Sequence, residues 1–331
     1  MNAVPVIDLS PIRGNDPAAI AALGREVDAA CREIGFLIVE GHGVDPALIA
    51  EVRRQSYAFF DLPEEEKQAV RPPPGTMLRG YTPPETNTLS RSRGIETPPD
   101  MRSLFSMGRP EADGTQYAEI PEARPFYQPN LWPAEPAGLR PAFTAYFREM
   151  ERLSTEIMRA FAVGLGLPIG FFDDKIDNHF AALHALHYGA RTTPAAPGQL
   201  RAGAHSDFGS LTILMPPAEG GMGLEVQKPD GSFAPVEPPP GAYVINIGDL
   251  MQQWTNERWV STVHRVVNPQ GEGWAQRRLS LGFFCHPNYD APVEALPGTV
   301  PAGEAPKHAP VLAGVYMNQK ISAVRRPVAT R

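Results

Sequence analysis

Apolar side chains recur every three or four residues in several stretches of the first half of the chain, which is the spacing of an amphipathic helix. The clearest stretches are residues 17–34, a segment that begins at Asp45-Pro46, and residues 141–165. Aspartate before proline favours a helix start, because the carboxylate caps the first turn and proline suits its first position. We therefore expect several helices before residue 165, the longest over residues 141–165.

The pattern changes beyond about residue 181, where short apolar runs alternate with Gly, Pro and Asn turns. The predicted strands are residues 183–188, 210–215, 223–227, 243–247, 260–267 and 279–285. Closely spaced short strands with turn signals between them are typical of a β-sandwich or jelly roll. The fold class predicted is mainly β with flanking helices.

These patterns divide the chain into four consecutive regions that we expect to form one compact unit. Residues 1–135 hold helices, short strands and a long loop over residues 71–136, which is rich in Pro, Gly, Ser and Thr. Residues 136–178 form support helices, residues 179–290 form the β core, and residues 291–331 form a tail that packs on it. Long loops in compact domains are usually functional or mobile.

Composition narrows the classes of function. The 331 residues carry a net charge of −7, without a basic stripe that nucleic-acid binding would favour. No apolar run approaches the roughly 20 residues of a membrane span, and residues 1–10 lack a signal-peptide pattern. With only two cysteines in the chain, we expect a reducing, cytoplasmic location.

Three residues form a candidate metal site. His205 and Asp207 are two positions apart, and residues i and i+2 of a strand point to one face. His264 stands in another strand-like run, which a jelly roll can place opposite the first. Two imidazoles and one carboxylate leave three positions of an octahedron open, as in non-haem Fe(II) oxygenases. The alternative is that these histidines are ordinary core residues.

Arginine at the start of a predicted strand is a candidate anion-binding group. Arg278 and Ser280 share one strand face with Gly282 and Phe284. An arginine that points into a β core needs an anionic partner, because an unpaired buried charge is costly. A guanidinium and a hydroxyl together suit a carboxylate. The alternative is that Arg277 and Arg278 form a solvated strand end.

Several motifs resemble, in order, those of the 2-oxoglutarate/Fe(II) oxygenases of the isopenicillin N synthase-like family. The matching segments are VPVIDLS, REIGFLIVEGHGVD, LHYG, HSDFGSLTIL, VINIGDLMQQWTNERWVSTVHRVV and RRLSLGFF. The resemblance covers nearly the whole chain and implies a distorted jelly roll, or double-stranded β-helix, of the cupin-like type. It implies the following site residues: His205, Asp207 and His264 as iron ligands, Arg278 and Ser280 on the 5-carboxylate of 2-oxoglutarate, and Tyr188 in contact with that cosubstrate.

The chain departs from the family pattern beside this site. The family frequently has arginine where His184 stands, asparagine at Leu186 and proline at Gly189. We expect Phe208 and Phe284 to be walls of the substrate pocket.

The expected function is that of a dioxygenase that uses Fe(II), 2-oxoglutarate and O₂ to hydroxylate, desaturate or cyclise a small organic molecule, releasing succinate and CO₂. One alternative is an isopenicillin N synthase-like oxidase that does not use 2-oxoglutarate. A second is a metal-binding module of the same fold without catalysis. A zinc hydrolase is a weaker alternative, because an HExxH helix is absent from the sequence.

Overall fold

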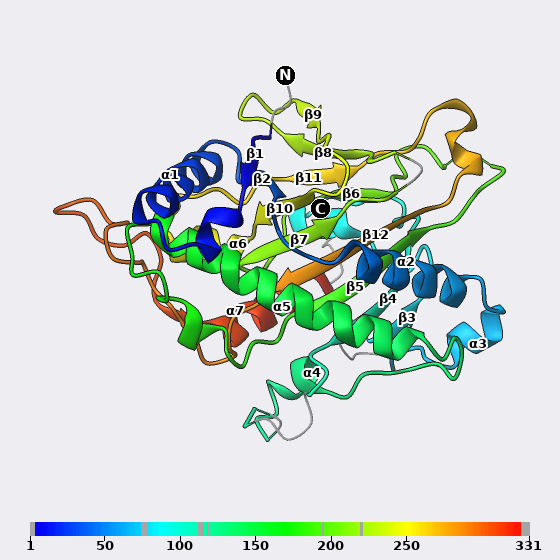
Figure 1. Cartoon of the computed structure of the whole chain (residues 1–331). Coiled ribbons are helices and arrows are strands. Elements are labelled where there is room, and N and C mark those ends of the chain that lie inside the picture. Colours follow the sequence, from blue (N-terminus) through cyan, green and yellow to red (C-terminus); the bar gives the residue numbers. More distant parts are fainter. Residues whose placement is uncertain are drawn as a thin grey trace.

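Two facing β-sheets with helices around them form the body of the protein (Figure 1). The computed structural model describes residues 4–73, 79–111, 116–117, 119–193, 195–218 and 221–325. Residues 1–3 of the predicted N-terminal region, residues 74–78, 112–115 and 118 of the predicted loop, and residues 326–331 of the predicted tail lie outside this description.

The three longest helices follow the apolar periodicity of the sequence. The helices are α1 (Pro17–Glu33), α2 (Pro46–Phe60), α3 (Glu64–Gln68), α4 (Arg124–Tyr127), α5 (Leu139–Gly164), α6 (Asp249–Trp254) and α7 (Ala313–Arg325). The predicted cap of α2 is present, because the Asp45 carboxylate accepts a hydrogen bond from Ala47 N at 2.8 Å. Among the described helices, none combines the length and the apolar character that a membrane span requires.

The strands are β1 (Val6–Asp8), β2 (Phe36–Glu40), β3 (Gly80–Thr82), β4 (Ser103–Gly108), β5 (Ala182–Tyr188), β6 (Ala202–His205), β7 (Leu211–Met215), β8 (Leu224–Gln227), β9 (Phe233–Pro235), β10 (Tyr243–Ile247), β11 (His264–Val266), β12 (Arg278–Cys285), β13 (Pro292–Val293) and β14 (Val311–Leu312). Each of the six runs predicted as strands beyond residue 181 contains one of them. The larger sheet has the order β1-β2-β10-β7-β12-β5-β4-β3, and the smaller sheet has the order β6-β11-β8-β9. The predicted β-rich fold with flanking helices is therefore confirmed.

The prediction of a long loop over residues 71–136 is wrong in part. β3 and β4 lie within it and extend the larger sheet, with β4 paired antiparallel to β5. All six residues of β4 are buried, so the strand shows no alternation of apolar and polar residues. A strand covered on both faces loses the period-2 signal by which it is recognised in a sequence.

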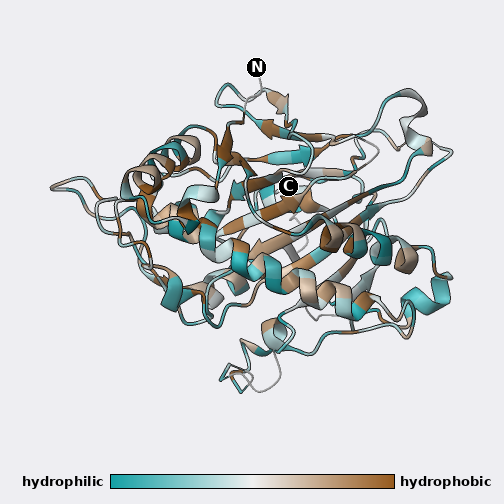
Figure 2. Ribbon diagram, in the orientation of Figure 1, coloured by the Kyte–Doolittle hydropathy of each residue, from teal (hydrophilic) through white to brown (hydrophobic). Residues whose placement is uncertain are grey.

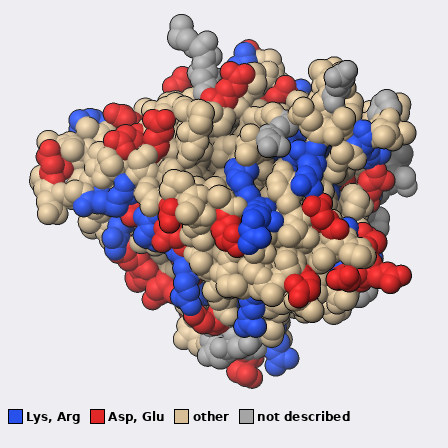
Figure 3. Space-filling view, turned by 45° about the vertical axis from the view of Figure 1, so that its right-hand side comes forward, with Lys and Arg blue, Asp and Glu red and all other residues tan. Residues whose placement is uncertain are grey.

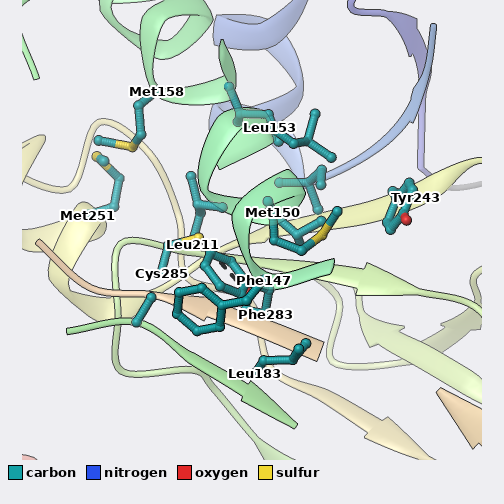
Figure 4. Packing of buried hydrophobic residues seen from close by; sticks show 14 of the residues in the cluster. Phe147, Met150, Leu153, Met158, Leu183, Leu211, Tyr243, Met251, Phe283 and Cys285 are labelled. Atoms are coloured by element: carbon teal, nitrogen blue, oxygen red, sulfur yellow. Dashed lines mark hydrogen bonds between the residues drawn. The ribbon is translucent and has the colours of Figure 1, made fainter. Parts of the chain in front are cut away.

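Helix α5 covers the outer face of the larger sheet and fills the main core. It crosses in front of the strands in Figure 1, and Figure 2 shows that many of these strands are hydrophobic. In Figure 4, Phe147 and Met150 of α5 point toward the sheet, and the ring of Phe147 meets that of Phe283 edge-on at 5.0 Å. Odd-numbered residues of β12 therefore face α5, and its even-numbered residues face the smaller sheet.

The C-terminal half of α1 holds the segment that leads into β11. Asp28 accepts hydrogen bonds from Arg258 Nε at 3.1 Å and from Trp259 Nε1 at 2.7 Å. Farther along, Thr262 Oγ1 donates to the Ile34 carbonyl at 2.6 Å. These contacts fix the approach of the chain to His264.

We expect Asp28→Ala to lower the free energy of unfolding by about 2–3 kcal/mol, because it leaves the Trp259 indole N–H and the Arg258 guanidinium without their acceptor. Urea denaturation measures this loss. Burial opposes ionisation of Asp28, but the hydrogen bonds from Arg258, Trp259 and Arg32 hold its pKa below the ordinary value of 3.8. A lowered carboxyl pKa stabilises the fold above the unfolded pKa and ceases to do so as the pH falls through the folded value.

The difference between wild type and Asp28→Ala should therefore shrink below about pH 4. Glu33→Ala, which removes an exposed acid from the same helix, is the control and should leave stability unchanged. Equal stability of wild type and Asp28→Ala at neutral pH would contradict this role.

Candidate active site

A cavity lies between the inner faces of the two sheets. The larger sheet contributes residues of β5, β7, β10 and β12, and the smaller sheet contributes residues of β6, β8 and β11. Its walls are formed by Arg102, Leu186, Tyr188, Ala202, His205, Asp207, Thr212, Leu214, Leu224, Asn246, His264, Val266, Arg278, Ser280 and Phe284. The predicted metal and anion-binding residues therefore line one space.

His205, Asp207 and His264 meet in this cavity. Antiparallel pairing of β6 with β11 places His264 directly opposite His205, and their ring centroids are 4.4 Å apart. Asp207 Oδ1 lies 3.7 Å from His205 Nε2, and its Oδ2 lies 3.9 Å from His264 Nε2. One donor atom from each residue lies within 4.8 Å of the other two, so a single ion can contact all three.

Backbone carbonyls orient both imidazole rings. His205 Nδ1 donates to the Gly203 carbonyl at 2.8 Å, and His264 Nδ1 donates to the Thr262 carbonyl at 3.1 Å. With the proton held on Nδ1, each Nε2 presents its lone pair to the cavity. Burial, followed by the neighbouring His264, lowers the pKa of His205 to about 3, so this ring is neutral at physiological pH. Neutral imidazole is the form that binds metals.

Asp207 is held by two polar side chains that the sequence analysis did not identify. Its Oδ2 accepts hydrogen bonds from Thr212 Oγ1 at 2.6 Å and from Asn246 Nδ2 at 2.7 Å. Burial opposes ionisation of Asp207, but the two imidazoles and these hydrogen bonds hold its pKa below the ordinary value. The sequence does contain a pattern that could have identified them. Thr212 and Asn246 are each a polar residue within a mainly apolar strand, on the face that points inward.

The predicted reason for the proximity of His205 and Asp207 is wrong. β6 ends at His205, and Asp207 lies in the turn that follows, so the two do not share a strand face. The turn is fixed instead by Asp249 N, which donates to the Asp207 carbonyl at 2.7 Å. Gly248 permits this approach, because a Cβ there would lie 2.1 Å from the Gly209 carbonyl oxygen.

Arg278 and Ser280 lie on the inner face of β12, as their alternation predicts, and each is only 1% exposed. The Arg278 guanidinium donates from Nε to Gly221 O at 3.2 Å and from Nη2 to Met222 O at 2.7 Å. It also lies 4.7 Å from the ring centroid of Tyr188, the residue opposite it on β5. The alternative of a solvated strand end is therefore excluded for Arg278.

Two polar atoms of this pair have no partner within the protein. Arg278 Nη1 and Ser280 Oγ are buried and make no hydrogen bond with any described residue. Buried donors are nearly always satisfied, and an unsatisfied one costs about 1–3 kcal/mol. Two such donors on one strand face of a cavity fit a carboxylate of a bound ligand.

The two aromatic residues expected in the substrate pocket lie in different places. Phe284 lines the cavity, and its ring lies 4.8 Å from that of His184. Phe208 packs against the main core instead, where Lys320 Nζ of α7 lies 5.6 Å from its ring centroid. Phe208 is therefore not among the residues that line this cavity.

The residues present fit an Fe(II) ion and a 2-oxo dicarboxylic acid. Two imidazoles and one carboxylate match the ligand set of non-haem Fe(II) oxygenases, which leaves positions for a chelating cosubstrate and O₂. A closed structural zinc site would need a fourth protein ligand. The cluster offers three ligands, and no further His, Cys, Asp or Glu of the described residues joins it.

Comparison with known sequence families identifies the chain. Residues 4–135 match the family described as non-haem dioxygenase in morphine synthesis N-terminal, and residues 178–287 match the 2OG-Fe(II) oxygenase superfamily. The chain is similar to validamycin A dioxygenase of Streptomyces hygroscopicus, with 35% identity over 91% of this chain and 81% of that protein. It is also similar to the 2-oxoglutarate-Fe(II) type oxidoreductase hxnY of Emericella nidulans, with 32% identity over 93% and 86% of the two chains.

A solved structure has the same architecture. The crystal structure of a full-length Neurospora crassa protein in complex with alpha-KG matches with a TM-score of 0.82 and 32% identity, over 96% of each chain. These relatives favour a 2-oxoglutarate-dependent enzyme over an oxidase without 2-oxoglutarate and over a non-catalytic module. The chain belongs to the isopenicillin N synthase-like 2-oxoglutarate/Fe(II) oxygenases, and it is an Fe(II)- and 2-oxoglutarate-dependent dioxygenase that oxidises a small organic molecule.

Proposed function

We propose that His205, Asp207 and His264 bind the catalytic Fe(II), and that Arg278 and Ser280 bind the 5-carboxylate of 2-oxoglutarate. One observation supports this assignment most directly. The three-ligand cluster lies in the same cavity as two buried donors without a described partner, Arg278 Nη1 and Ser280 Oγ. Neither set of groups has another role in the described structure, and together they match the two ends of a chelating 2-oxo acid.

The clamp residues are positioned before any ligand binds. The carbonyls of Gly221 and Met222 hold the Arg278 guanidinium on one side, so its Nη1 is directed into the cavity. Tyr188 stacks beneath the cation and limits its rotation. A guanidinium that is fixed in this way loses little entropy when it binds a carboxylate.

The remaining walls control where the oxidation occurs. Bound iron and 2-oxoglutarate supply O₂ activation, coupled to decarboxylation of the 2-oxo acid to succinate and CO₂. Leu186, Leu214 and Phe284 form apolar walls beside the metal ligands. Such walls exclude water from the reaction and leave space for the carbon skeleton of a substrate.

The partner is a small molecule, as it is for the relatives. The name of one relative gives validamycin A as its substrate, and a further crystal structure of the Neurospora crassa protein contains thymine. On the face drawn in Figure 3, basic and acidic side chains are interspersed rather than gathered by sign. This distribution supports a small-molecule enzyme over a nucleic-acid-binding protein.

The cysteines Cys31 and Cys285 are free and buried, which supports the proposed cytoplasmic location.

We expect Asn246→Ala to weaken Fe(II) binding about 10- to 100-fold, the usual effect of removing a group that orients a metal ligand. The substitution leaves Asp207 in place but removes one of its two hydrogen bonds. Anaerobic titration with Fe(II), or with Co(II) as a spectroscopic probe, measures the dissociation constant. Asn318→Ala, on α7, is the control and should bind iron as wild type does. Wild-type affinity in the Asn246 variant would contradict the positioning role.

We expect Arg278→Gln to raise the KM for 2-oxoglutarate by about 100-fold or more, because the 5-carboxylate loses a charge-assisted bidentate partner. Fe(II) affinity should stay unchanged, since Arg278 does not contact the metal ligands. The control is Arg277→Gln, which removes the neighbouring arginine that pairs with Asp61 on the surface. Unchanged KM for 2-oxoglutarate in Arg278→Gln would exclude the clamp.

The proposed activity is tested by incubating the purified protein with Fe(II), labelled 2-oxoglutarate and a library of small molecules, and by measuring labelled succinate. Succinate should form in wild type and not in Asp207→Ala. Equal succinate formation by both proteins would contradict the assignment of the iron ligands.

A further inference from the structure

A second arginine, Arg102, lines the same cavity and has no part in the proposed iron or cosubstrate sites. It immediately precedes β4, whose Leu104 is paired with Leu186 of β5. Residues 102 and 104 are two positions apart in extended chain, so their side chains point to the same face. The Arg102 side chain therefore lies on the inner face of the sheet, as Leu104 does. Its place in the cavity wall agrees with this orientation.

The guanidinium of Arg102 has an N–H that no described residue satisfies. Its Nε is buried without a hydrogen-bond partner. No hydrogen bond or ion pair within 4.0 Å joins Arg102 to another residue in the described ranges. An arginine with a desolvated N–H and no acceptor is costly, so it is normally paired or reserved for a ligand.

The acidic residue nearest in the sequence, Asp100, is committed elsewhere. Its Oδ1 accepts a hydrogen bond from Gly203 N at 2.8 Å, and its Oδ2 accepts one from Leu89 N at 3.0 Å. These bonds fasten the segment before β4 to β6. Burial raises the pKa of Asp100, and the charge of Arg102 lowers it only in part. Asp100 therefore moderates the field of Arg102 without contacting it.

The side chains that pack beside Arg102 are mostly apolar. Leu104, Leu186, Tyr188 and Leu214 form an apolar cluster on this face. Burial, followed by the charges of Arg102 and Arg79, lowers the pKa of His184 to about 3, so that ring carries no charge at physiological pH. The wall near Arg102 is thus largely apolar, and the other arginine of the cavity wall, Arg278, is the one assigned to the cosubstrate.

Formal charges indicate that the cosubstrate does not use this cation. Fe(II) and the Asp207 carboxylate together carry one positive charge, and Arg278 adds another. Doubly charged 2-oxoglutarate neutralises both. Arg102 then remains as a positive group in a cavity whose dielectric is low, where a second anion is strongly favoured.

We propose that Arg102 binds a carboxylate of the primary substrate, and that the enzyme oxidises a small organic acid whose carbon skeleton packs on Leu186, Leu214 and Phe284. A planar carboxylate matches the guanidinium fork in a bidentate manner, which also fixes the orientation of the skeleton toward the metal ligands. This inference rests on the proposed function, because it takes the cavity to be the oxygenase site.

The experiment compares acids with their neutral amides in the enzyme loaded with Fe(II) and 2-oxoglutarate. Suitable pairs are benzoate and benzamide, phenylacetate and phenylacetamide, and nicotinate and nicotinamide, within a larger library of acids. The acids that bind should raise succinate formation above the substrate-free rate, and the matching amides should not. Calorimetric titration under nitrogen measures the binding of the same compounds without turnover.

The Arg102→Gln variant should raise both the KM and the Kd of a stimulating acid about 10- to 100-fold, the loss expected for a charge-assisted hydrogen bond. Its KM for 2-oxoglutarate should match that of wild type. Arg102→Lys should recover part of the affinity. Arg91→Gln, which removes an exposed arginine paired with Glu96, is the matched control and should change none of these values.

Three results would overturn the inference: amides that stimulate as well as their acids, a Kd for the acid that Arg102→Gln leaves unchanged, or an effect of Arg102→Gln on the KM for 2-oxoglutarate instead. Failure of the proposed function is recognised separately, because wild type would then form no succinate from 2-oxoglutarate with any compound. The calorimetric titration still tests Arg102 in that case.

Discussion

The hydrogen-bonded register of two short strands, β6 and β11, is the contact on which the site depends. It places His205 opposite His264, and the turn after β6 carries Asp207 between them. A slip of one residue would turn either imidazole to the opposite face of the sheet. The register is supported from outside by α1, which fixes the chain before His264, and from inside by Asn246 and the carbonyls that orient the rings.

The same cavity concentrates charges that the fold satisfies only in part. Asp207 receives hydrogen bonds from neutral side chains, whereas Arg278 and Arg102 keep N–H groups without an acceptor. In a region of low dielectric such groups favour anionic ligands strongly. The fold thus separates two proposed tasks: the strand pairs position the metal ligands, and Arg278 and Arg102 select the acids that bind beside them.

Much of this arrangement was accessible from the sequence. The helical periods, six of the ten described strands beyond residue 181 and the alternation that places Arg278 and Ser280 on one face all follow from local patterns. Local patterns did not reveal β4, because both of its faces are buried. Asn246 and Arg102 acquire meaning only when the two sheets face each other, since their partners or neighbours are distant in the sequence. Thr212 is only five residues from its partner Asp207, but the pairing depends on the turn between them.

The most direct test of this account is a crystal structure of the protein grown with Fe(II) and 2-oxoglutarate under nitrogen, with the metal located by anomalous scattering at the iron edge. We expect one iron bound by His205 Nε2, a carboxylate oxygen of Asp207 and His264 Nε2, with the distal carboxylate of 2-oxoglutarate on Arg278 Nη1 and Ser280 Oγ. Iron bound elsewhere, or a cosubstrate carboxylate directed away from Arg278, would contradict it.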